Sequence, residues 1–219
     1  MRIFGANEFA SSAARHIAER LRSARSAVIT GGSTARRIYT ELRRFEGIPN
    51  LEIAFSDERS VPPDHDASNY GMARRTLLDP LGLTNIHRIY GEDDPVEAAA
   101  AYEEDVRDLV ESGFDLVLLG LGDDAHIAAL FPGAGAVSEK TRLCVPVERP
   151  DGMRGITLTL PALLSGKEII VAADGGGKAG AVRRAIRGDE PPDAAPVQGL
   201  AAADRVTFLL DEGAGGLLS

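Results

Sequence analysis

His126 is the residue whose type and setting best suit proton transfer. It lies in the segment GLGDDAH, residues 120–126, soon after the apolar stretch Phe114–Leu119. An imidazole titrates near neutral pH and can take a proton from water, and a neighbouring carboxylate such as that of Asp124 can orient the ring and stabilise its protonated form. Taken alone, a histidine after a buried stretch can equally have a structural role, so these residues leave both interpretations open.

Two glycine-containing segments have the composition of phosphate-binding loops. The segment TGGST contains Gly31, Gly32, Ser33 and Thr34, and the segment DGGGK ends at Lys178. Between a strand and a helix, such a segment directs unpaired backbone amides and the positive end of the helix dipole at an anion. A glycine turn with a Ser/Thr cap, or a flexible turn with a solvated lysine, explains the same residues. The first segment lacks the lysine of a P-loop, which argues against a nucleotide triphosphatase.

A third polar segment, SDERS, follows another apolar stretch and offers Asp57 and Arg59. The planar guanidinium of Arg59 could bind a phosphate or a carboxylate, although a solvated charged turn is the usual role of such a run. The run DHD at residues 64–66 is a poor metal site because three adjacent residues cannot surround one ion, and we expect no metal. Residues 120–125 also match a weak dinucleotide-binding pattern, but the two aspartates there would repel a pyrophosphate.

These polar segments require strands and helices that bring them together. Short apolar segments, often β-branched, predict strands, and segments with apolar residues three or four apart predict helices. The predicted strands are Ala27–Thr30, Leu51–Ser56, Ile86–Tyr90, Phe114–Leu119, Gly155–Thr159, Glu168–Ala172 and Arg205–Leu210, and the predicted helices are Glu8–Arg22, Thr34–Arg44, Tyr70–Leu78, Val96–Glu111 and Lys178–Arg187. This alternation predicts a doubly wound, Rossmann-like α/β fold with a mostly parallel sheet and helices on both faces. Ligands of such sheets bind beyond the carboxyl ends of the strands.

Composition narrows the classes of function. The 219 residues suit a single domain over residues 1–219, and the net charge of −9 without a basic cluster argues against nucleic acid and anionic membranes as partners. Cys144 is the only cysteine, which excludes an intrachain disulfide, and its apolar surroundings predict a buried, inert thiol. No apolar run of 18 residues and no signal-peptide pattern is present, so we expect a cytoplasmic protein.

In this order and combination, five segments resemble the 6-phosphogluconolactonase family, which is related to glucosamine-6-phosphate deaminases. The segments are TGGSTARRIYTEL, FSDERSVPPDHDASNYGMARRTLL, FDLVLLGLGDDAHIAALFPG, ITLTLPALLSGKEIIVAADGGGKAGAVRRAI and VTFLLDEGA. The resemblance implies hydrolysis of 6-phosphoglucono-δ-lactone in the pentose phosphate pathway, with a sugar phosphate as partner and no metal or organic cofactor. It implies that His126 is the catalytic histidine, acting as a general base on water. It also implies that Gly32, Ser33, Thr34, Arg59 and Lys178 contact the phosphate and the substrate.

Several residues near His126 depart from the family pattern. Ala125 stands where the family has glycine, and if the backbone there needs a positive φ, alanine costs about 1 kcal/mol or more. Ile127 and Ala129 replace a threonine and a serine, and Gly155 stands where an arginine is usual, with Arg154 one place earlier. These changes leave a second hypothesis open, a sugar-phosphate-binding protein of this fold with weak or lost catalysis.

A third hypothesis, a glucosamine-6-phosphate deaminase or isomerase, is weakened because the Asn-Glu pair that follows the histidine in deaminases is absent. The sequence leaves open whether Asp124 or Asp57 orients His126, and whether a backbone amide or Arg59 stabilises the oxyanion. It also leaves open whether the protein is a monomer or a small homo-oligomer, and whether the surface loop Gly188–Pro196 closes over substrate.

Overall fold

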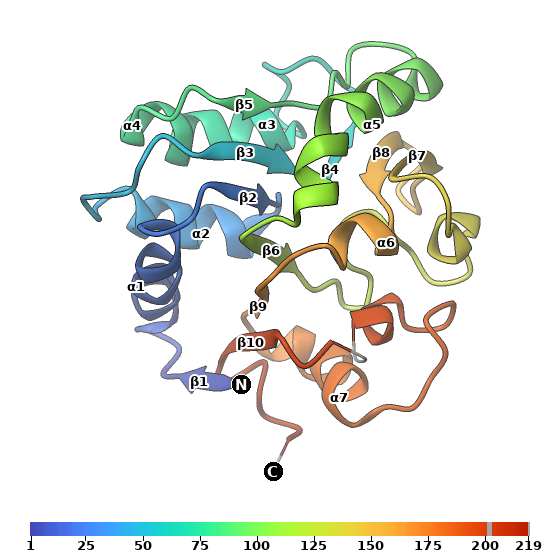
Figure 1. The fold of residues 1–219 in the computed structure, drawn as a ribbon. Coiled ribbons are helices and arrows are strands. Elements are labelled where there is room, and N and C mark those ends of the chain that lie inside the picture. The colour runs from blue at the N-terminus through green and yellow to red at the C-terminus, as the bar shows by residue number, and fades with distance from the viewer. Residues whose placement is uncertain (201–202, 219) are drawn as a thin grey trace.

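The computed structural model describes residues 1–200 and 203–218, and its centre is a seven-stranded sheet (Figure 1). Its strands run in the order β1 (Arg2–Phe4), β10 (Val206–Asp211), β9 (Ile169–Ala173), β6 (Leu116–Gly120), β2 (Ser26–Ile29), β3 (Glu52–Phe55) and β5 (Ile86–His87). Every neighbouring pair is parallel. The predicted doubly wound, mostly parallel α/β fold is thereby confirmed.

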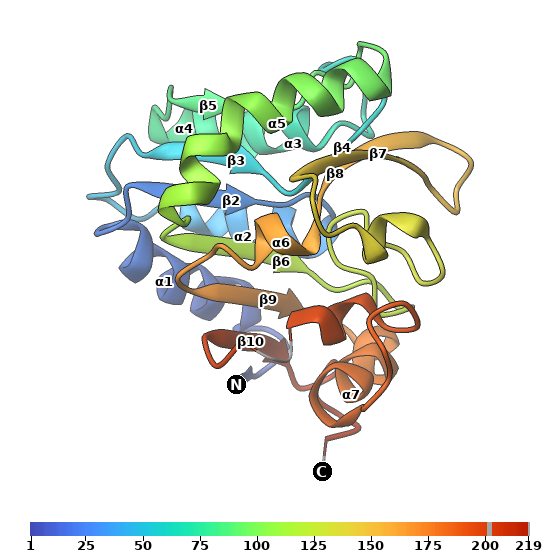
Figure 2. The ribbon, with the colours of Figure 1, turned by 45° about the vertical axis from the view of Figure 1, so that its right-hand side comes forward.

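A second, antiparallel sheet lies beside the carboxyl ends of the main strands (Figure 2). It contains β4 (Asp57–Arg59), β8 (Arg154–Leu158) and β7 (Cys144–Glu148). The sequence suggested a polar turn over Asp57 to Arg59, and this was wrong because these residues pair with residues 155–157. The paired segments are about a hundred residues apart in the sequence, so no local pattern indicates the pairing.

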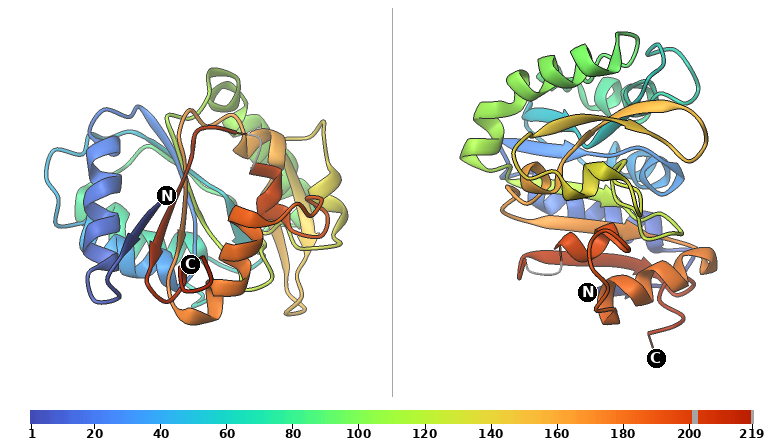
Figure 3. Two further views of the ribbon diagram at one scale, coloured as in Figure 1. Left: turned by 90° about the horizontal axis from the view of Figure 1, so that it is seen from below. Right: turned by 90° about the vertical axis from the view of Figure 1, so that its right-hand side faces the viewer.

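Helices cover both faces of the main sheet, as Figure 3 shows from below. The helices are α1 (Phe9–Leu21), α2 (Ser33–Leu42), α3 (Asn69–Ala73), α4 (Asp79–Leu81), α5 (Pro95–Ser112), α6 (Leu160–Leu163) and α7 (Ala179–Arg187). The helix predicted over Tyr70–Leu78 is divided, because a π-helical turn, Arg74–Leu78, follows α3. None of the helices in the described ranges is long and apolar enough to cross a membrane.

The main core lies on both sides of β6, β2 and β9. All residues of β2 and β9, and Leu116 to Leu119 of β6, are buried. Continuous burial of this kind is typical of a parallel strand covered on both faces, and it explains why β6 carries almost no polar residue. Cys144 is buried at the start of β7, and burial raises the pKa of its thiol, in agreement with the expectation of an inert residue.

The order of the strands creates a crevice between β2 and β6. From β2 the chain proceeds to β3 and β5 at one edge, and from β6 it proceeds to β9 and β10 at the other. β2 and β6 are neighbours in the sheet, and the connections that leave them therefore run toward opposite edges of the sheet. A parallel α/β sheet binds its ligands at such a point.

Candidate functional site

A cavity of about 140 Å³ lies at the carboxyl ends of the strands that border this crevice. Its lining comes from six separate segments and comprises Thr30, Gly31, Gly32, Ser33, Thr34, Asp57, Arg59, Asn69, Gly120, Leu121, Gly122, His126, Ala128, Arg149 and Lys178. The structure thus brings together all the predicted site residues except Asp124 and Arg154. Asp124 lines an adjoining hollow that shares His126, Arg149 and Lys178 with the cavity.

The loop after β2 presents backbone to the cavity. Gly32 adopts φ +95° before the start of α2 at Ser33, and the first intrahelical bond runs from the Arg36 amide to the Gly32 carbonyl at 3.0 Å. The amides of Ser33 and Thr34 lie before that bond, at the positive end of the helix dipole. A Cβ at Gly31 would lie 1.7 Å from the Asn69 side-chain oxygen, so any other residue there would displace Asn69. This geometry suits an anion.

The loop after β6 holds His126 by two hydrogen bonds to one carboxylate. Nδ1 of His126 lies 2.6 Å and its backbone nitrogen 3.1 Å from Oδ1 of Asp124. Partial burial of Asp124 opposes its ionisation, but the bonds and positive charge offered by His126 outweigh it and lower the pKa of the carboxyl. A carboxylate only accepts, so Nδ1 carries the proton and, in the neutral ring, Nε2 carries the lone pair. Asp124, and not Asp57, is therefore the residue bonded to the ring.

The ring position also depends on its neighbours. Phe131 lies against the imidazole with ring centroids 4.6 Å apart. A Cβ at Gly122 would lie 2.0 Å from Nδ1, so the ring occupies space that only glycine leaves free. The backbone of Gly122 is in turn bonded to His126, with the Gly122 amide 2.9 Å from the His126 carbonyl oxygen.

Ala125 adopts φ +73°, so the backbone at this position has the positive φ that is unfavourable for alanine. Ala128, which lines the cavity, has φ +51°. Left-handed backbone at alanine costs about 1 kcal/mol per residue. Ile127 and Ala129 are completely buried and face the core, and the substitutions at these two positions therefore remove no hydroxyl from the cavity wall.

Arg59 reaches the cavity from β4 and is tied to Asn69, a residue that the sequence analysis did not select. Nη1 of Arg59 bonds the Asn69 side-chain oxygen and lies 3.1 Å from the Ala67 carbonyl oxygen. Nδ2 of Asn69 in turn donates to the Asp57 carbonyl oxygen at 2.8 Å. Nε of Arg59 is buried and bonds none of the described residues. A buried donor of this kind costs about 1–3 kcal/mol unless something accepts from it. Glu58 accepts the Asn69 amide at 2.7 Å, and burial raises the pKa of its carboxyl despite three backbone donors.

Lys178 enters the cavity from the turn before α7. Its Nζ lies 2.6 Å from Oδ1 of Asp123, so the cation is paired with the loop that carries His126. Lys178 is the last residue of a 3-10 turn, Gly176–Lys178, and α7 begins one residue later than predicted.

Arg149 also lines the cavity without having been predicted from the sequence, and it lies where Arg154 was expected. Its side chain is only 8% exposed, with Nε 3.2 Å from Oδ2 of Asp151 and Nη1 4.0 Å from Oδ2 of Asp57. Its guanidinium carbon lies 5.2 Å from the centroid of Phe131, the ring that also contacts His126. No signal in the sequence distinguished Arg149, because the β7–β8 hairpin that places it was not predicted.

The structure does not bring Arg154 into the cavity lining. It pairs across the hairpin with Glu148 and is exposed. Gly155 faces the other way, and a Cβ there would lie 3.3 Å from Cδ of Arg149 and 2.8 Å from the Glu58 carbonyl oxygen. The stem of Arg149 thus occupies the space beside Gly155.

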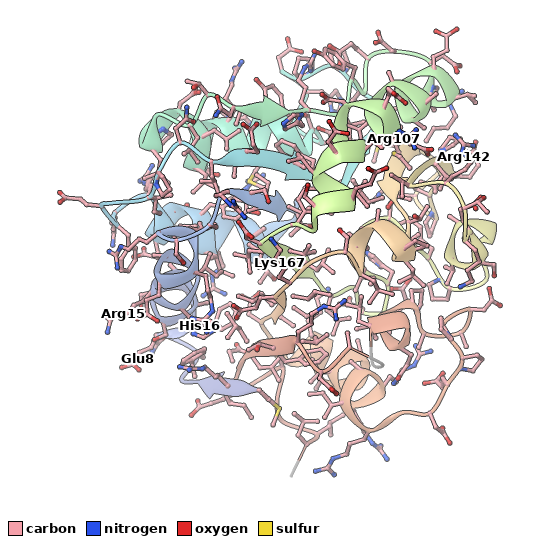
Figure 4. All side chains as sticks on the ribbon, in the orientation of Figure 1. Glu8, Arg15, His16, Arg107, Arg142 and Lys167 are labelled. Atoms are coloured by element: carbon pink, nitrogen blue, oxygen red, sulfur yellow. The ribbon has the colours of Figure 1, made fainter. Side chains whose placement is uncertain are left out.

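The other three histidines, His16, His65 and His87, line neither this cavity nor the adjoining hollow. His16 lies on α1 (Figure 4). Both its ring nitrogens are buried and bond none of the described residues. Burial lowers the pKa of His16, which favours the neutral form of its ring.

The chain matches known proteins along most of its length. The family model for glucosamine-6-phosphate isomerases/6-phosphogluconolactonase matches residues 5–209. A 6-phosphogluconolactonase from Synechocystis is 33% identical over 198 residues, covering 85% of this chain and 82% of that protein. A 6-phosphogluconolactonase from Homo sapiens is 35% identical over 178 residues, covering 76% of this chain and 68% of that protein.

Solved structures agree. The 6-phosphogluconolactonase of Trypanosoma brucei superposes with a TM-score of 0.87 at 25% identity, covering 100% of this chain and 98% of that chain. A monomeric glucosamine-6-phosphate deaminase gives a TM-score of 0.86 at 22% identity, which shows a common fold and nothing further. With its cavity at the β2–β6 crevice and its match over residues 5–209, the chain belongs to the family of glucosamine-6-phosphate isomerases and 6-phosphogluconolactonases.

Proposed function

We propose that this chain hydrolyses 6-phosphoglucono-δ-lactone to 6-phosphogluconate. The observation that carries the proposal is the bond between His126 Nδ1 and Asp124 in a cavity that also contains the Gly31–Thr34 loop and Lys178. A proton acceptor and a phosphate cradle in one cavity suit a phosphorylated ester. Relatives named 6-phosphogluconolactonase, at 33% and 35% identity, support the same substrate.

His126 is the general base of the proposed reaction. Nε2 of the neutral ring takes a proton from a water molecule while the water oxygen attacks the lactone carbonyl carbon. The tetrahedral intermediate then collapses, the ring C–O bond breaks, and the imidazolium returns the proton to the leaving ring oxygen. Asp124 holds the tautomer that this transfer needs and stabilises the charged ring between the two steps.

Substrate binding is proposed to use the remaining groups of the cavity. The amides of Ser33 and Thr34 and the ammonium of Lys178 bind the phosphate, and positioning through such a remote group lowers the barrier of the reaction at the other end. Arg149, nearly buried beside Phe131, adds a second cation on the side of His126. The unpartnered Nε of Arg59 supports a contact between Arg59 and a substrate oxygen.

Retained catalysis is favoured over a binding protein that has lost it. The concern from the sequence was that Ala125 could move the loop and mis-aim His126. In the structure Ala125 takes the positive φ and the bond between His126 and Asp124 is formed, which supports a competent site. A deaminase is disfavoured because Leu130 to Gly133 contain no carboxylate to assist opening of a sugar ring.

The experiment is an assay of lactone hydrolysis coupled to 6-phosphogluconate dehydrogenase, with spontaneous hydrolysis subtracted. The expected result is a rate far above background. A background rate together with measurable binding of 6-phosphogluconate would support the binding protein, and ammonia release from glucosamine 6-phosphate would support a deaminase. A single domain over residues 1–219, a cytoplasmic location and a monomer or small homo-oligomer stay predictions.

A further inference from the structure

The backbone on both sides of Ala125 is held by a complete set of hydrogen bonds. The amide of Ala125 donates to the Gly122 carbonyl at 3.1 Å, and the carbonyl of Ala125 accepts from the Val197 amide at 3.2 Å. The amide of His126 donates to Oδ1 of Asp124 at 3.1 Å, and the carbonyl of Asp124 accepts from Nη1 of Arg184 at 3.0 Å. All four polar groups of the two peptide units that flank Ala125 are therefore bonded.

Arg184 is the one side chain from outside the loop in this set. It lies on α7, and its other nitrogens lie 2.8 Å from the Ala194 carbonyl oxygen and 2.8 Å from each carboxylate oxygen of Glu190. A bidentate arginine–carboxylate pair fixes the plane of the guanidinium, so Nη1 reaches Asp124 from a rigid base. The loop Gly188–Pro196, considered as a possible lid in the sequence analysis, thus lies bonded to α7, and Arg184 joins both to the catalytic loop.

This connection matters because the loop backbone is strained. Alanine at φ +73° relaxes by rotation of the peptide between Asp124 and Ala125, which carries the carbonyl that Arg184 holds. Such a rotation displaces Asp124, whose carboxylate fixes the ring of His126.

We propose that Arg184 is a positioning residue for the His126–Asp124 pair, and that it stabilises the left-handed conformation that Ala125 adopts in place of glycine. Arg184 does not line the cavity, and it bonds the backbone carbonyl of Asp124 and neither the carboxylate of Asp124 nor the ring of His126. Its action on the reaction is indirect, through the Asp124 carbonyl. The kinetic part of this inference rests on the proposed function, whereas the structural part does not.

The first test compares Arg184→Met with Arg183→Met. Both remove one positive charge from the same helix, but Arg183 is exposed and bonds none of the described residues. Arg184→Met is expected to lower kcat for the lactone about 10- to 100-fold, the scale of a misplaced catalytic group, with KM within about threefold. Arg183→Met is expected to retain the kcat of the unmodified protein. Arg184→Lys retains the charge, but its donors lie on a single nitrogen and cannot reach partners that surround three guanidinium nitrogens, so its kcat should lie close to that of Arg184→Met.

The second test asks whether the effect acts through Ala125. In the Arg184→Met background, Ala125→Gly removes the strain at positive φ and should recover most of the lost kcat, whereas the single Ala125→Gly variant should gain far less. If Arg184→Met does not fold, Glu190→Gln replaces it, because it loosens the guanidinium without deleting it. Glu190→Gln is then expected to lower kcat by a smaller factor, again recovered by Ala125→Gly.

The third readout is the proton NMR signal of the His126 Nδ1–H group, identified by its loss in His126→Gln. It should be present in the unmodified protein, weakened in Arg184→Met and restored with Ala125→Gly. If the unmodified protein hydrolyses lactone at the background rate, the proposed function fails, while this signal still tests the positioning role. An unchanged signal and kcat in Arg184→Met, with only a lower melting temperature, would overturn the inference.

Discussion

The loops that leave β2 and β6 border the same crevice but are built in different ways. The β2 loop has glycine at its one left-handed position, Gly32, and at Gly31, where Asn69 comes closest. The β6 loop has glycine at Gly122, where the histidine ring approaches, but alanine at two of its left-handed positions, Ala125 and Ala128. The first is a relaxed backbone cradle, and the second is a strained support for one side chain.

This difference follows from what each loop offers a substrate. A cradle made of backbone amides needs only the correct turn, which glycine supplies locally. A histidine ring needs a fixed orientation, and the β6 loop obtains it from Asp124, Phe131 and contacts with α7 and Val197. Substitutions in the β2 loop and at Lys178 should therefore change binding, and those around His126 should change the rate of the chemical step.

Gly122→Ala should have the largest effect of the substitutions that leave His126 itself in place. The added Cβ would lie 2.0 Å from Nδ1, so the ring has to leave its position beside Asp124. We expect kcat to fall about 100-fold or more, because small misplacements of catalytic groups have effects of that size. The matched control is Gly135→Ala, where a Cβ meets nothing within 4 Å. Equal kinetics for the two variants would contradict the ring position.

Asp124→Asn should lower kcat about 10- to 100-fold with little change in KM, because an amide no longer stabilises the charged ring. The pKa of Asp124 is lowered in the folded protein. Its carboxylate therefore stabilises the fold at pH values above its ordinary pKa of about 3.9, and this contribution is lost as the pH falls through the lowered pKa. Unfolding measured against pH should show a smaller loss of stability in acid for the asparagine variant. An equal loss in the two proteins would mean that the bond to His126 is absent.

Lys178→Ala should mainly raise KM, by about 10-fold or more, since a charge-assisted contact with phosphate is lost. The substitution also removes the ion pair between Lys178 and Asp123, so the free energy of unfolding should fall slightly as well. Competitive inhibition by 6-phosphogluconate measures the binding effect separately. A large fall in kcat with unchanged KM would mean that the roles of Lys178 and His126 are exchanged.

Arg149→Met should raise KM by a smaller factor, about 3- to 10-fold, because this guanidinium already has carboxylate partners in Asp57 and Asp151. Arg154→Met removes the same charge from the same hairpin at an exposed position and should leave KM unchanged. If the two variants exchanged these results, the arginine expected from the sequence would be the one that binds.

The sequence was sufficient for features that depend on local pattern and insufficient for those that depend on distant pairing. Apolar continuity identified β6, and glycine followed by Ser33 and Thr34 identified the turn at the start of α2, since both signals lie within a few residues. Arg149 was missed because its place depends on pairing of β7 with β8, and β8 with β4. Arg154 was chosen by proximity in sequence, whereas strand alternation turns its side chain outward.

Ala125 shows a further limit. The sequence suggested strain there, but the groups that hold the strained backbone come from Arg184 and Val197, about sixty and seventy residues later in the chain. Whether a substitution near a catalytic residue disables it depends on such contacts. Only the folded structure displays them.

The central claim is that His126 transfers the proton while other residues hold the substrate. The most direct measurement is kcat for lactone hydrolysis by His126→Gln, taken together with the dissociation constant of 6-phosphogluconate. The account predicts that kcat falls about 10²- to 10⁴-fold while the dissociation constant changes little. A variant that hydrolyses the lactone at the rate of the unmodified protein would contradict it.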